Sequence, residues 1–258
     1  MTLLEDLLQS VGEGHTLKVL VGLHWTAVIA EREGERRCGL SSTLTSAHEQ
    51  HGDTDVPEAG ALVSVPAHEL ATFANDSTRP IRASIGVAAI NALLPQLTAD
   101  AYIEANAEQV IAKHGEGKVV AIVGDFPFME RLSKHVEELF IFDQQPREGV
   151  LPVEAAADIL PRAEFVAITG RAFVNHSLEA LLSLCAADAS VMVLGPSTPL
   201  SPILFDYGVD FISGAQVVHI DPVLEAIAQG ANFRQVHRAG VRLVTVERAK
   251  FMKASRDV

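Results

Sequence analysis

The strongest pattern along the chain is a short apolar run that ends abruptly at a glycine. Residues 119–123 are mostly β-branched, which is typical of a strand buried on both faces of a parallel sheet. Gly124 permits a sharp turn, Pro127 suits the first turn of a helix, and residues 128–136 have helical spacing. Free backbone N–H groups at a helix start attract anions, so we expect a ligand to bind where this strand ends.

The first hundred residues have a mixed pattern that predicts both helices and an antiparallel meander of strands. The expected elements are a helix at 3–11, one or two strands within 17–30, a strand at 38–44, a loop at 45–60 and helices at 66–73 and 81–94. Asn91 lies on the buried face of the last helix. Because a buried amide needs hydrogen-bond partners, Asn91 belongs either to a structural network or to a ligand site.

Beyond residue 100, strands and helices alternate, which is the signature of a parallel sheet with helical crossovers. After the strand at 118–123 we expect strands at 139–142, 165–168 and 191–194 and a fifth near 205–213. The expected helices are 102–114, 128–136, 153–160, 178–187 and 221–230. Asp221 should be the N-cap of the last helix. The tail after residue 233 is ambiguous. The change of pattern predicts two domains packed together, an α+β domain at 1–103 and a parallel-sheet α/β domain at 104–258.

Glycine turns with polar neighbours follow three of the predicted strands, at Gly124, at Thr169-Gly170 and at Gly195. The carboxyl ends of parallel strands lie on one edge of a sheet, so these turns should converge there. Asp143 ends the second strand, 18 residues after Asp125, close to the spacing at which dinucleotide folds place a ribose-binding acid. A loop salt link or an N-cap is the alternative for Asp143.

Two further segments should lie near the same edge. Residues 144–152 form a polar loop in which Arg147 and Glu148 are candidates for reaching over the site, and Asn175 precedes the next helix, where it is a ligand contact or a plain cap. The candidate ligand-binding residues are therefore Asn91, Gly124, Asp125, Phe126, Pro127, Asp143, Glu148, Thr169, Gly170, Asn175, Gly195, Pro196 and Ser197.

Composition narrows the classes of partner. The net charge of −13 argues against a nucleic-acid ligand, and no apolar run is long enough to span a bilayer. With no basic leader either, we expect a cytoplasmic protein without a membrane partner. Cys38 and Cys185 fit no zinc spacing. His48 and His51 in an acidic loop could bind a metal ion, but a solvated loop is the favoured interpretation.

Several short motifs together resemble the heavy-metal chelation protein family of unknown function. They are Gly124-Asp-Phe-Pro-Phe128, Glu148-Gly149 with Pro152, Ile168-Thr-Gly170 with Asn175, Gly195-Pro-Ser197 with Pro199, and Gly214 followed by Asp221; residues 21–27 and 85–91 resemble the recurrent stretches of the family's first half. The resemblance implies an enolase amino-terminal-like α+β domain followed by a Rossmann-like domain, with a ligand site in the cleft between them.

Two functions follow as hypotheses. In the first, the protein binds a small anionic or nucleotide-like ligand in that cleft, as an enzyme or as a binding protein. In the second, it handles a heavy metal ion or a metal chelate. The first uses the residues better, because soft metals need thiolates or clustered imidazoles and the family motifs contain only His24 and His176. The sequence indicates no particular cofactor or catalytic group, and it leaves homo-oligomerisation open.

Overall fold

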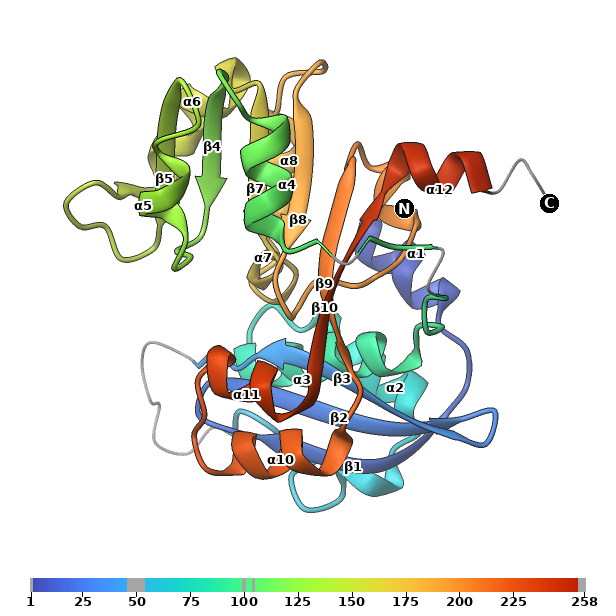
Figure 1. Cartoon of the computed structure of the whole chain (residues 1–258). Coiled ribbons are helices and arrows are strands. Elements are labelled where there is room, and N and C mark those ends of the chain that lie inside the picture. Colours follow the sequence, from blue (N-terminus) through green and yellow to red (C-terminus); the bar gives the residue numbers. More distant parts are fainter. Residues whose placement is uncertain (1, 46–53, 99–100, 104, 255–258) are drawn as a thin grey trace.

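The computed structural model describes residues 2–45, 54–98, 101–103 and 105–254. It is an α/β structure built on two sheets, one antiparallel with three strands and one mostly parallel with seven (Figure 1). The predicted fold class is therefore confirmed. The antiparallel sheet comes from the first part of the chain and the larger sheet from the second, as the change of pattern near residue 100 indicates.

The three-stranded sheet is the predicted meander. Strands β1 (His15–Val21), β2 (Trp25–Arg32) and β3 (Glu35–Ser42) pair in sequence order, with β2 in the middle. The pair Arg32 and Glu35 closes a two-residue turn between β2 and β3. Helix α1 (Leu3–Ser10) precedes the sheet and begins with a capping box formed by Thr2 and Glu5.

Helix α3 (Pro80–Leu93) covers one face of this sheet and is buried along most of its length. It lies very close to β3, because a Cβ on Gly39 would stand 2.1 Å from the carbonyl oxygen of Ala88. Only glycine permits that approach. Helix α2 (Ala67–Thr72), flanked by the 3₁₀ turns Leu62–Ser64 and Phe73–Asn75, completes this side.

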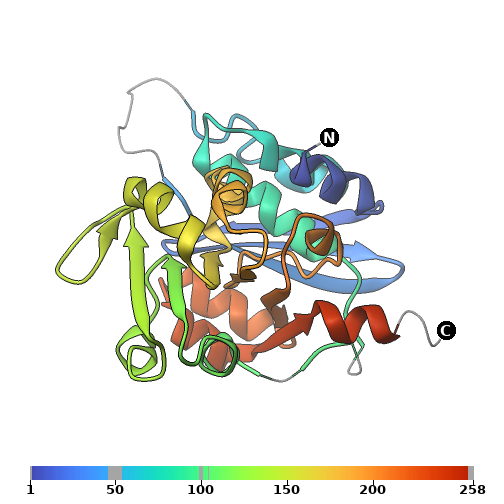
Figure 2. The same ribbon diagram turned by 90° about the horizontal axis from the view of Figure 1, so that it is seen from above.

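The opposite face of the same sheet is covered by a distant part of the chain. Helices α10 (Ile220–Ala228) and α11 (Phe233–Gly240) lie on it, and Figure 2 shows the blue strands between the cyan helices and these orange-red ones. The contact is apolar: Ala27, Ile29 and Leu40 pack with Val223, Leu224, Ile227 and Val236. The three-stranded sheet is thus the middle layer of a sandwich closed by residues far away in sequence.

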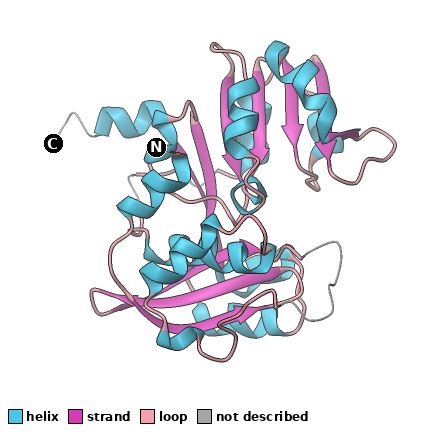
Figure 3. Cartoon of the chain, turned by 180° about the vertical axis from the view of Figure 1, so that it is seen from behind, coloured by secondary structure: helices cyan, strands magenta, loops and turns pink. Residues whose placement is uncertain are grey.

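The larger sheet has the strand order β10-β9-β8-β7-β4-β5-β6. Figure 3 shows the strands of both sheets in magenta and the helices around them in cyan. Its strands are β4 (Val119–Val123), β5 (Glu138–Asp143), β6 (Leu151–Pro152), β7 (Phe165–Thr169), β8 (Ser190–Leu194), β9 (Phe211–Val217) and β10 (Val241–Glu247). All neighbouring pairs are parallel except β9 and β10. From β4 the chain builds outward through β5 and β6 on one side, then returns to build β7, β8 and β9 on the other. The switch point of the sheet therefore lies between β4 and β7.

Several of the helices that follow the strands of the larger sheet are short. Residues 128–136 form only α5 (Met129–Leu132), and α7 (Arg171–Val174) and α9 (Ile203–Asp206) have four residues each. The remaining helices are α4 (Ala107–His114), α6 (Ala156–Ile159), which lies between the 3₁₀ turns Val153–Ala155 and Leu160–Arg162, α8 (Leu178–Leu184) and α12 (Arg248–Ala254).

Four details of the prediction are wrong. The helix expected at 102–114 begins only at Ala107, because Ile103 pairs as a bridge with Thr245 of β10. The expected N-cap Asp221 lies inside α10, whose N-cap is His219, and instead pairs with Arg36 at 3.3 Å. Gly214 lies within β9 rather than after it. The helical spacing of 128–136 yields a single turn of α5 followed by turns.

Candidate functional site

The glycines at the strand ends do converge on one edge, but their N–H groups are occupied. Gly124 donates to the carbonyl of Phe142, Gly170 to that of Leu194, and Gly195 to that of Ser213, at 2.7, 2.7 and 3.0 Å. Each glycine thus prolongs the hydrogen-bond ladder by one residue. The N–H groups of these three glycines are therefore not available to a ligand, and the helices that follow β4 and β7, α5 and α7, are only four residues long.

The ends of β4 and β7 touch at the switch point. Gly124 has φ +115°, and a Cβ there would lie 2.9 Å from Cβ of Thr169. The following residue, Asp125, pairs with Arg147 across 2.7 Å, and both side chains are about half exposed at 45% and 54%. Arg147 therefore reaches back over the edge from the loop after β5, and Glu148 stands beside it in the same exposed turn.

Phe126 and Phe128 stack on each other in the loop after β4, with ring centroids 5.4 Å apart. Both rings also pack on the core on the α4 side of the larger sheet, while Pro127 between them is exposed. These residues shape the loop at the edge of the sheet.

Two predicted residues make local turn contacts. Oδ1 of Asp143 accepts the N–H of Gln145 at 2.9 Å, a contact within its own loop. Oδ1 of Asn175 accepts the N–H and the hydroxyl of Ser177, at 3.2 and 2.7 Å. These bonds hold the start of α8 in the manner of an Asx turn.

Asn91 and Ser197 join the two parts of the molecule. Nδ2 of Asn91 donates to the carbonyl of Leu40 at 2.8 Å and lies 3.4 Å from the carbonyl of Ser197. The hydroxyl of Ser197 accepts the N–H of Ser42 at 2.8 Å, and Ser197 is only 1% exposed. We call this contact between β3, α3 and the loop after β8 the seam. The structural alternative for Asn91 therefore has two hydrogen bonds in its support.

The loop after β8 also packs tightly against the end of β7. A Cβ on Gly170 would lie 2.5 Å from Oγ1 of Thr198, so this glycine is required for the close approach. The hydroxyl of Thr198 is buried and makes no hydrogen bond to the described residues. Gly195 and Pro196 start this loop above the carboxyl end of β8.

An open groove of about 340 Å³ lies between the two parts of the molecule, beside this sheet edge. We call it the edge groove. Its walls come from the segment after β3, from the start of α3, and from the loops after β5 and β7, and include Thr43, Thr45, Ser77, Gln144, Arg171 and His176. Of the predicted ligand residues only Asn175 lines it.

The charges around the edge groove favour an anion. The guanidinium of Arg171 makes no hydrogen bond or ion pair to any described residue, and Arg171 is exposed. His176 stands beside it with a left-handed backbone, φ +58°. The carboxylate of Asp76 is already engaged, because it accepts hydrogen bonds from Thr78, from the N–H of Arg79 and from Arg82.

The protonation state of the Asp76 carboxyl follows from these hydrogen-bond partners. Burial alone would raise the pKa of its carboxyl, but the hydrogen bonds from Thr78, Arg79 and Arg82 outweigh burial and lower the pKa to about 2. Asp76 is therefore a carboxylate whose charge is balanced within its own network, in which Arg82 also pairs with Glu58 at 2.8 Å.

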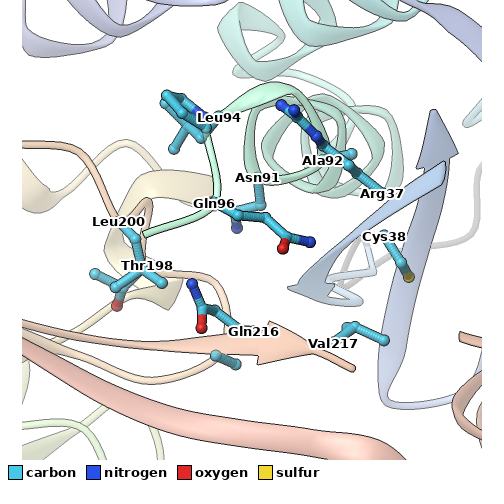
Figure 4. A pocket seen from close by; sticks show the side chains of 12 residues that line it. Arg37, Cys38, Asn91, Ala92, Leu94, Gln96, Thr198, Leu200, Gln216 and Val217 are labelled. Atoms are coloured by element: carbon cyan, nitrogen blue, oxygen red, sulfur yellow. The ribbon is translucent and has the colours of Figure 1, made fainter. Parts of the chain in front are cut away.

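A second, smaller cavity of about 40 Å³ opens between the end of α3 and β9 (Figure 4). Arg37 and Cys38 of β3, Asn91 of α3, Gln96, and Gln216 of β9 are among the residues that line it. We call it the Arg37 cavity.

A metal site built from several side chains is absent from the described part of the chain, where no three His, Cys, Asp or Glu residues lie together in a metal-binding group. Burial raises the pKa of the Cys38 thiol to about 12 and of the Cys185 thiol to about 11, so neither supplies a thiolate readily. His48 and His51 lie outside the described residues. None of the described helices is both long and apolar enough to cross a membrane.

Sequence patterns miss several of the residues that line the edge groove. Thr43 and Ser77 belong to no motif, and they meet the other lining residues only because the two sheets pack together. Gln144 begins the polar loop predicted at this edge, and Asn175 is a predicted residue. Arg171 gives a further signal, since it is a cation directly after the Thr169-Gly170 turn at a strand end.

Comparison with known proteins places this fold among proteins without an assigned function. A crystal structure of a protein of unknown function from the DUF364 family of Desulfitobacterium hafniense has a TM-score of 0.78 and 25% identity, covering 95% of this chain and 97% of that one. A second such structure, from Pyrococcus horikoshii, has a TM-score of 0.78 and 20% identity, covering 95% and 98%. An uncharacterized protein of Methanocaldococcus jannaschii is 25% identical over 211 residues, 78% of each chain.

Two family models also match, both with the description "Putative heavy-metal chelation". The DUF4213 model matches residues 4–94 and the DUF364 model matches residues 106–245. The first range contains the antiparallel sheet with α3, and the second contains the larger sheet except the last two residues of β10. Because the second match alone spans more than half of the sequence, the chain belongs to the DUF364 family.

Proposed function

We propose that this protein binds a small anionic or nucleotide-like ligand in the edge groove, as an enzyme or as a binding protein. The observation that carries the proposal is the guanidinium of Arg171, which is without a partner among the described residues and faces a groove of about 340 Å³. The groove is large enough for a small organic molecule, since ligand pockets typically begin at about 300 Å³.

The position of the groove supports the proposal. Open α/β sheets bind their ligands outside the carboxyl ends of the strands, near the switch point. Gln144 follows the end of β5 and Arg171 follows the end of β7, so the groove flanks the end of β4 between them. A ligand in the groove would lie beside the Asp125–Arg147 pair and the turns at Gly124 and Thr169-Gly170.

The start of α3 supports an anion as well. Pro80, the first residue of this 14-residue helix, lines the groove. Asp76 accepts the N–H of the N-cap residue Arg79, but no described side chain caps the N–H groups of the first turn. The positive end of the helix dipole adds to the charge of Arg171. In a protein with a net charge of −13, a helix start and a cation that has no partner among the described residues favour the binding of an anionic group.

A screen by thermal unfolding tests this proposal. Nucleosides, nucleotides, cofactors and organic acids are added to the purified protein, and a ligand at about 100 times its Kd should add about 2.7 kcal/mol, a shift of several degrees. Product analysis of each hit decides between an enzyme and a binding protein.

The matched control for the screen uses two arginines. Arg171→Gln removes the proposed contact, and Arg234→Gln removes the same charge from an exposed position on α11. The shift should shrink in the first variant and persist in the second. An anionic hit whose shift is equal in both variants would place its site outside the edge groove.

The second candidate function is the handling of a heavy metal or a metal chelate, which the description of both family models favours. A metal bound to an organic acid presents carboxylate oxygens, so Arg171 could bind such a complex without direct metal ligands from the protein. Metal chelates therefore belong in the same screen, each beside the free chelator and the free metal ion.

Elemental analysis separates this second candidate from direct chelation. We expect that replacing both His48 and His51 with alanine leaves the bound-metal content of the purified protein unchanged, because two imidazoles alone make an incomplete site. A stoichiometric metal that disappears in the double variant would establish direct chelation by that segment.

A further inference from the structure

We infer that the ligand of the edge groove is a phosphate monoester, and that His176 binds its phosphate group together with Arg171. This inference rests on the proposed function of the groove and specifies both the class of ligand and a second binding residue. The observation that carries it is the backbone of His176, which adopts a conformation that favours glycine at a position that lines the groove.

Helix α7 ends in a Schellman motif, and His176 occupies the position of that motif at which glycine is usual. The N–H of Ser177 donates to the carbonyl of Ala172 at 3.0 Å, which is the bond that defines the motif. This bond requires a left-handed residue before Ser177, and His176 has φ +58°. Oδ1 of Asn175 also accepts the N–H and the hydroxyl of Ser177, so the turn is fixed on both sides of His176.

Helices α9 and α10 end in the same motif, and both use glycine. Gly208 follows α9 with φ +86° and Gly230 follows α10 with φ +78°, and the N–H of the next residue donates back into the helix in each case. A Cβ on Gly208 would meet no described atom within 4 Å, and one on Gly230 only a side-chain atom at 3.9 Å. Both glycines are therefore required by the backbone angle and not by crowding.

Of these three positions, His176 is the one that lines the edge groove. A left-handed backbone is unfavourable for a residue with a Cβ, although histidine adopts it more often than most. Such strain is concentrated at ligand sites. The imidazole makes no hydrogen bond or ion pair to any described residue, so no contact within the described chain accounts for a histidine here. We therefore assign it to the ligand of the groove.

Helix α7 is a rigid base for the side chains that would bind the ligand. Residues 172–174 are at most 3% exposed and belong to the main core, and α7 packs against α3 and β3. Figure 1 shows α7 just below the end of β7. The N–H of Asn175 donates to the carbonyl of Arg171 at 3.1 Å, so these two residues lie one helical turn apart on the same side. His176 follows directly, and all three line the groove.

The donors on this turn suit a phosphate group better than a carboxylate. The guanidinium of Arg171 and Nδ2 of Asn175 make no hydrogen bond to the described residues, and an imidazole has an N–H to donate in either protonation state. The two oxygens of a carboxylate lie in one plane, and a guanidinium alone can bond to both. A phosphate monoester has three terminal oxygens around a tetrahedral phosphorus, so it can accept hydrogen bonds from all three side chains at once.

The edge groove also has room for the rest of the ester. Its volume of about 340 Å³ is far more than five non-hydrogen atoms need, at about 10 to 15 Å³ for an atom of the size of water. Thr45, Ser77 and Gln144 line it with hydroxyl and amide groups. The carboxylate of Asp76 does not oppose a phosphate, because Arg82 is paired with it at 3.2 Å.

Two measurements on purified full-length variants test the role of His176: titration calorimetry with inorganic phosphate at constant ionic strength, and thermal unfolding without phosphate. His176→Gly should weaken phosphate binding about two- to tenfold, as for one lost hydrogen bond. It should also raise the unfolding midpoint by about 2 to 4 °C, because glycine relieves the strained backbone. Unchanged phosphate affinity would overturn the inference. So would weaker binding together with a lower midpoint, since the side chain would then support the fold.

Two further variants separate the imidazole from the backbone. His176→Ala keeps the Cβ and hence the strain, so it should weaken phosphate binding equally while the unfolding midpoint stays unchanged. Gly208→His introduces a histidine at the same position of the motif after α9, outside the described residues that line the groove. It should lower the midpoint by about 2 to 4 °C and leave phosphate affinity unchanged. Equal losses of affinity in Gly208→His and His176→Gly would overturn the inference.

Arg171→Gln distinguishes this inference from the proposed function. Phosphate binding that is lost in Arg171→Gln but unchanged in His176→Gly would retain the edge groove as an anion site and refute the role of His176. Phosphate binding that is unchanged in both variants would refute the groove itself. Acetate under the same conditions tests the class of ligand, and it should bind more weakly than phosphate. Tighter binding of acetate, or no measurable binding of phosphate to the wild type, would overturn the choice of a phosphate ester.

Discussion

The backbone N–H of Ser42 donates a 2.8 Å hydrogen bond to the hydroxyl of Ser197, and the two hydroxyl oxygens lie 3.2 Å apart. Ser42 ends β3 in the antiparallel sheet, and Ser197 lies in the loop after β8 of the parallel sheet. Both residues are buried, at 8% and 1% exposure. A residue whose sequence context suggested ligand binding therefore holds the two parts of the molecule in register.

Ser197→Ala should accordingly reduce stability. The substitution leaves the buried N–H of Ser42 without its acceptor, which typically costs about 1 to 3 kcal/mol. Urea unfolding at neutral pH measures the loss. The control is Ser183→Ala, since the exposed hydroxyl of Ser183 only bonds to the carbonyl of Ala180 within its own helix and its removal should cost less than about 0.5 kcal/mol. Equal stabilities for the two variants would contradict the assignment of the seam.

The glycines that end β4 and β8 form a matched pair for testing the close approach at the switch point. Gly124 and Gly195 have φ +115° and +114°. A Cβ on Gly124 would lie 2.9 Å from Thr169, whereas on Gly195 the closest described atom would be 3.9 Å away. Both alanine variants should have a free energy of unfolding that is about 1 to 3 kcal/mol lower, because alanine is strained at this backbone angle. Overpacking against Thr169 should lower the free energy of unfolding of Gly124→Ala by about 1 to 3 kcal/mol more. Urea unfolding of both variants measures the difference, and equal losses would refute the contact.

The carboxylate of Asp76 should make stability depend on pH in the acid range. Its pKa is about 2 in the folded protein, below the ordinary 3.8, because its hydrogen bonds outweigh the effect of burial. A depressed pKa stabilises the folded state at a pH above the unfolded value, and this contribution is lost as the pH falls through the folded value. Asp76→Asn should therefore cost about 2 kcal/mol at pH 7.

That difference between wild type and Asp76→Asn should shrink as the pH falls from about 4 towards 2. Urea unfolding at each pH gives the free energies, with Asp158→Asn, at an exposed position, as the control. A difference that stays constant down to pH 2 would mean that the charge of Asp76 is not what stabilises the network.

The phenol of Tyr207 should ionise at an unusually high pH. Its hydroxyl donates to Oδ2 of Asp6 at 2.6 Å, and this bond together with burial and the nearby negative charges raises the pKa of Tyr207 to about 12. A raised pKa means that the contact stabilises the folded state below about pH 10 and is lost as the pH rises towards 12.

The chain has two tyrosines, so Tyr102→Phe leaves Tyr207 as the only phenol to follow by ultraviolet absorbance. Adding Asp6→Asn to this variant should lower the midpoint towards 10. Circular dichroism must show native structure across the range. A midpoint near 10 in the folded Tyr102→Phe variant would refute the hydrogen bond.

The elements that were predictable from sequence are those whose signals are local. The apolar run at 119–123, the stripe at 3–11 and the buried helix near 81–94 all depend on spacing within one segment, and each is present in the structure. The convergence of Gly124, Gly170 and Gly195 on one edge follows from the geometry of parallel strands.

The occupied N–H groups of these glycines were not predictable in the same way. Whether a strand-end N–H meets a neighbouring carbonyl depends on the register and length of the next strand. For the same reason Asn91 and Ser197 could not be assigned to the seam, because their partners Leu40 and Ser42 belong to the other sheet. The residues of the edge groove lie on four separate segments, and only tertiary packing brings them together.

The sandwich around the antiparallel sheet has a consequence for folding while the chain is being synthesised. When the first hundred residues leave the ribosome, α3 can cover one face of this sheet, but Ala27, Ile29 and Leu40 on the other face must wait for α10 and α11. At typical rates of translation, about 5 to 20 residues per second, these apolar side chains stay uncovered for on the order of ten seconds or more. The nascent chain thus offers a binding surface for chaperones until α10 and α11 have been synthesised.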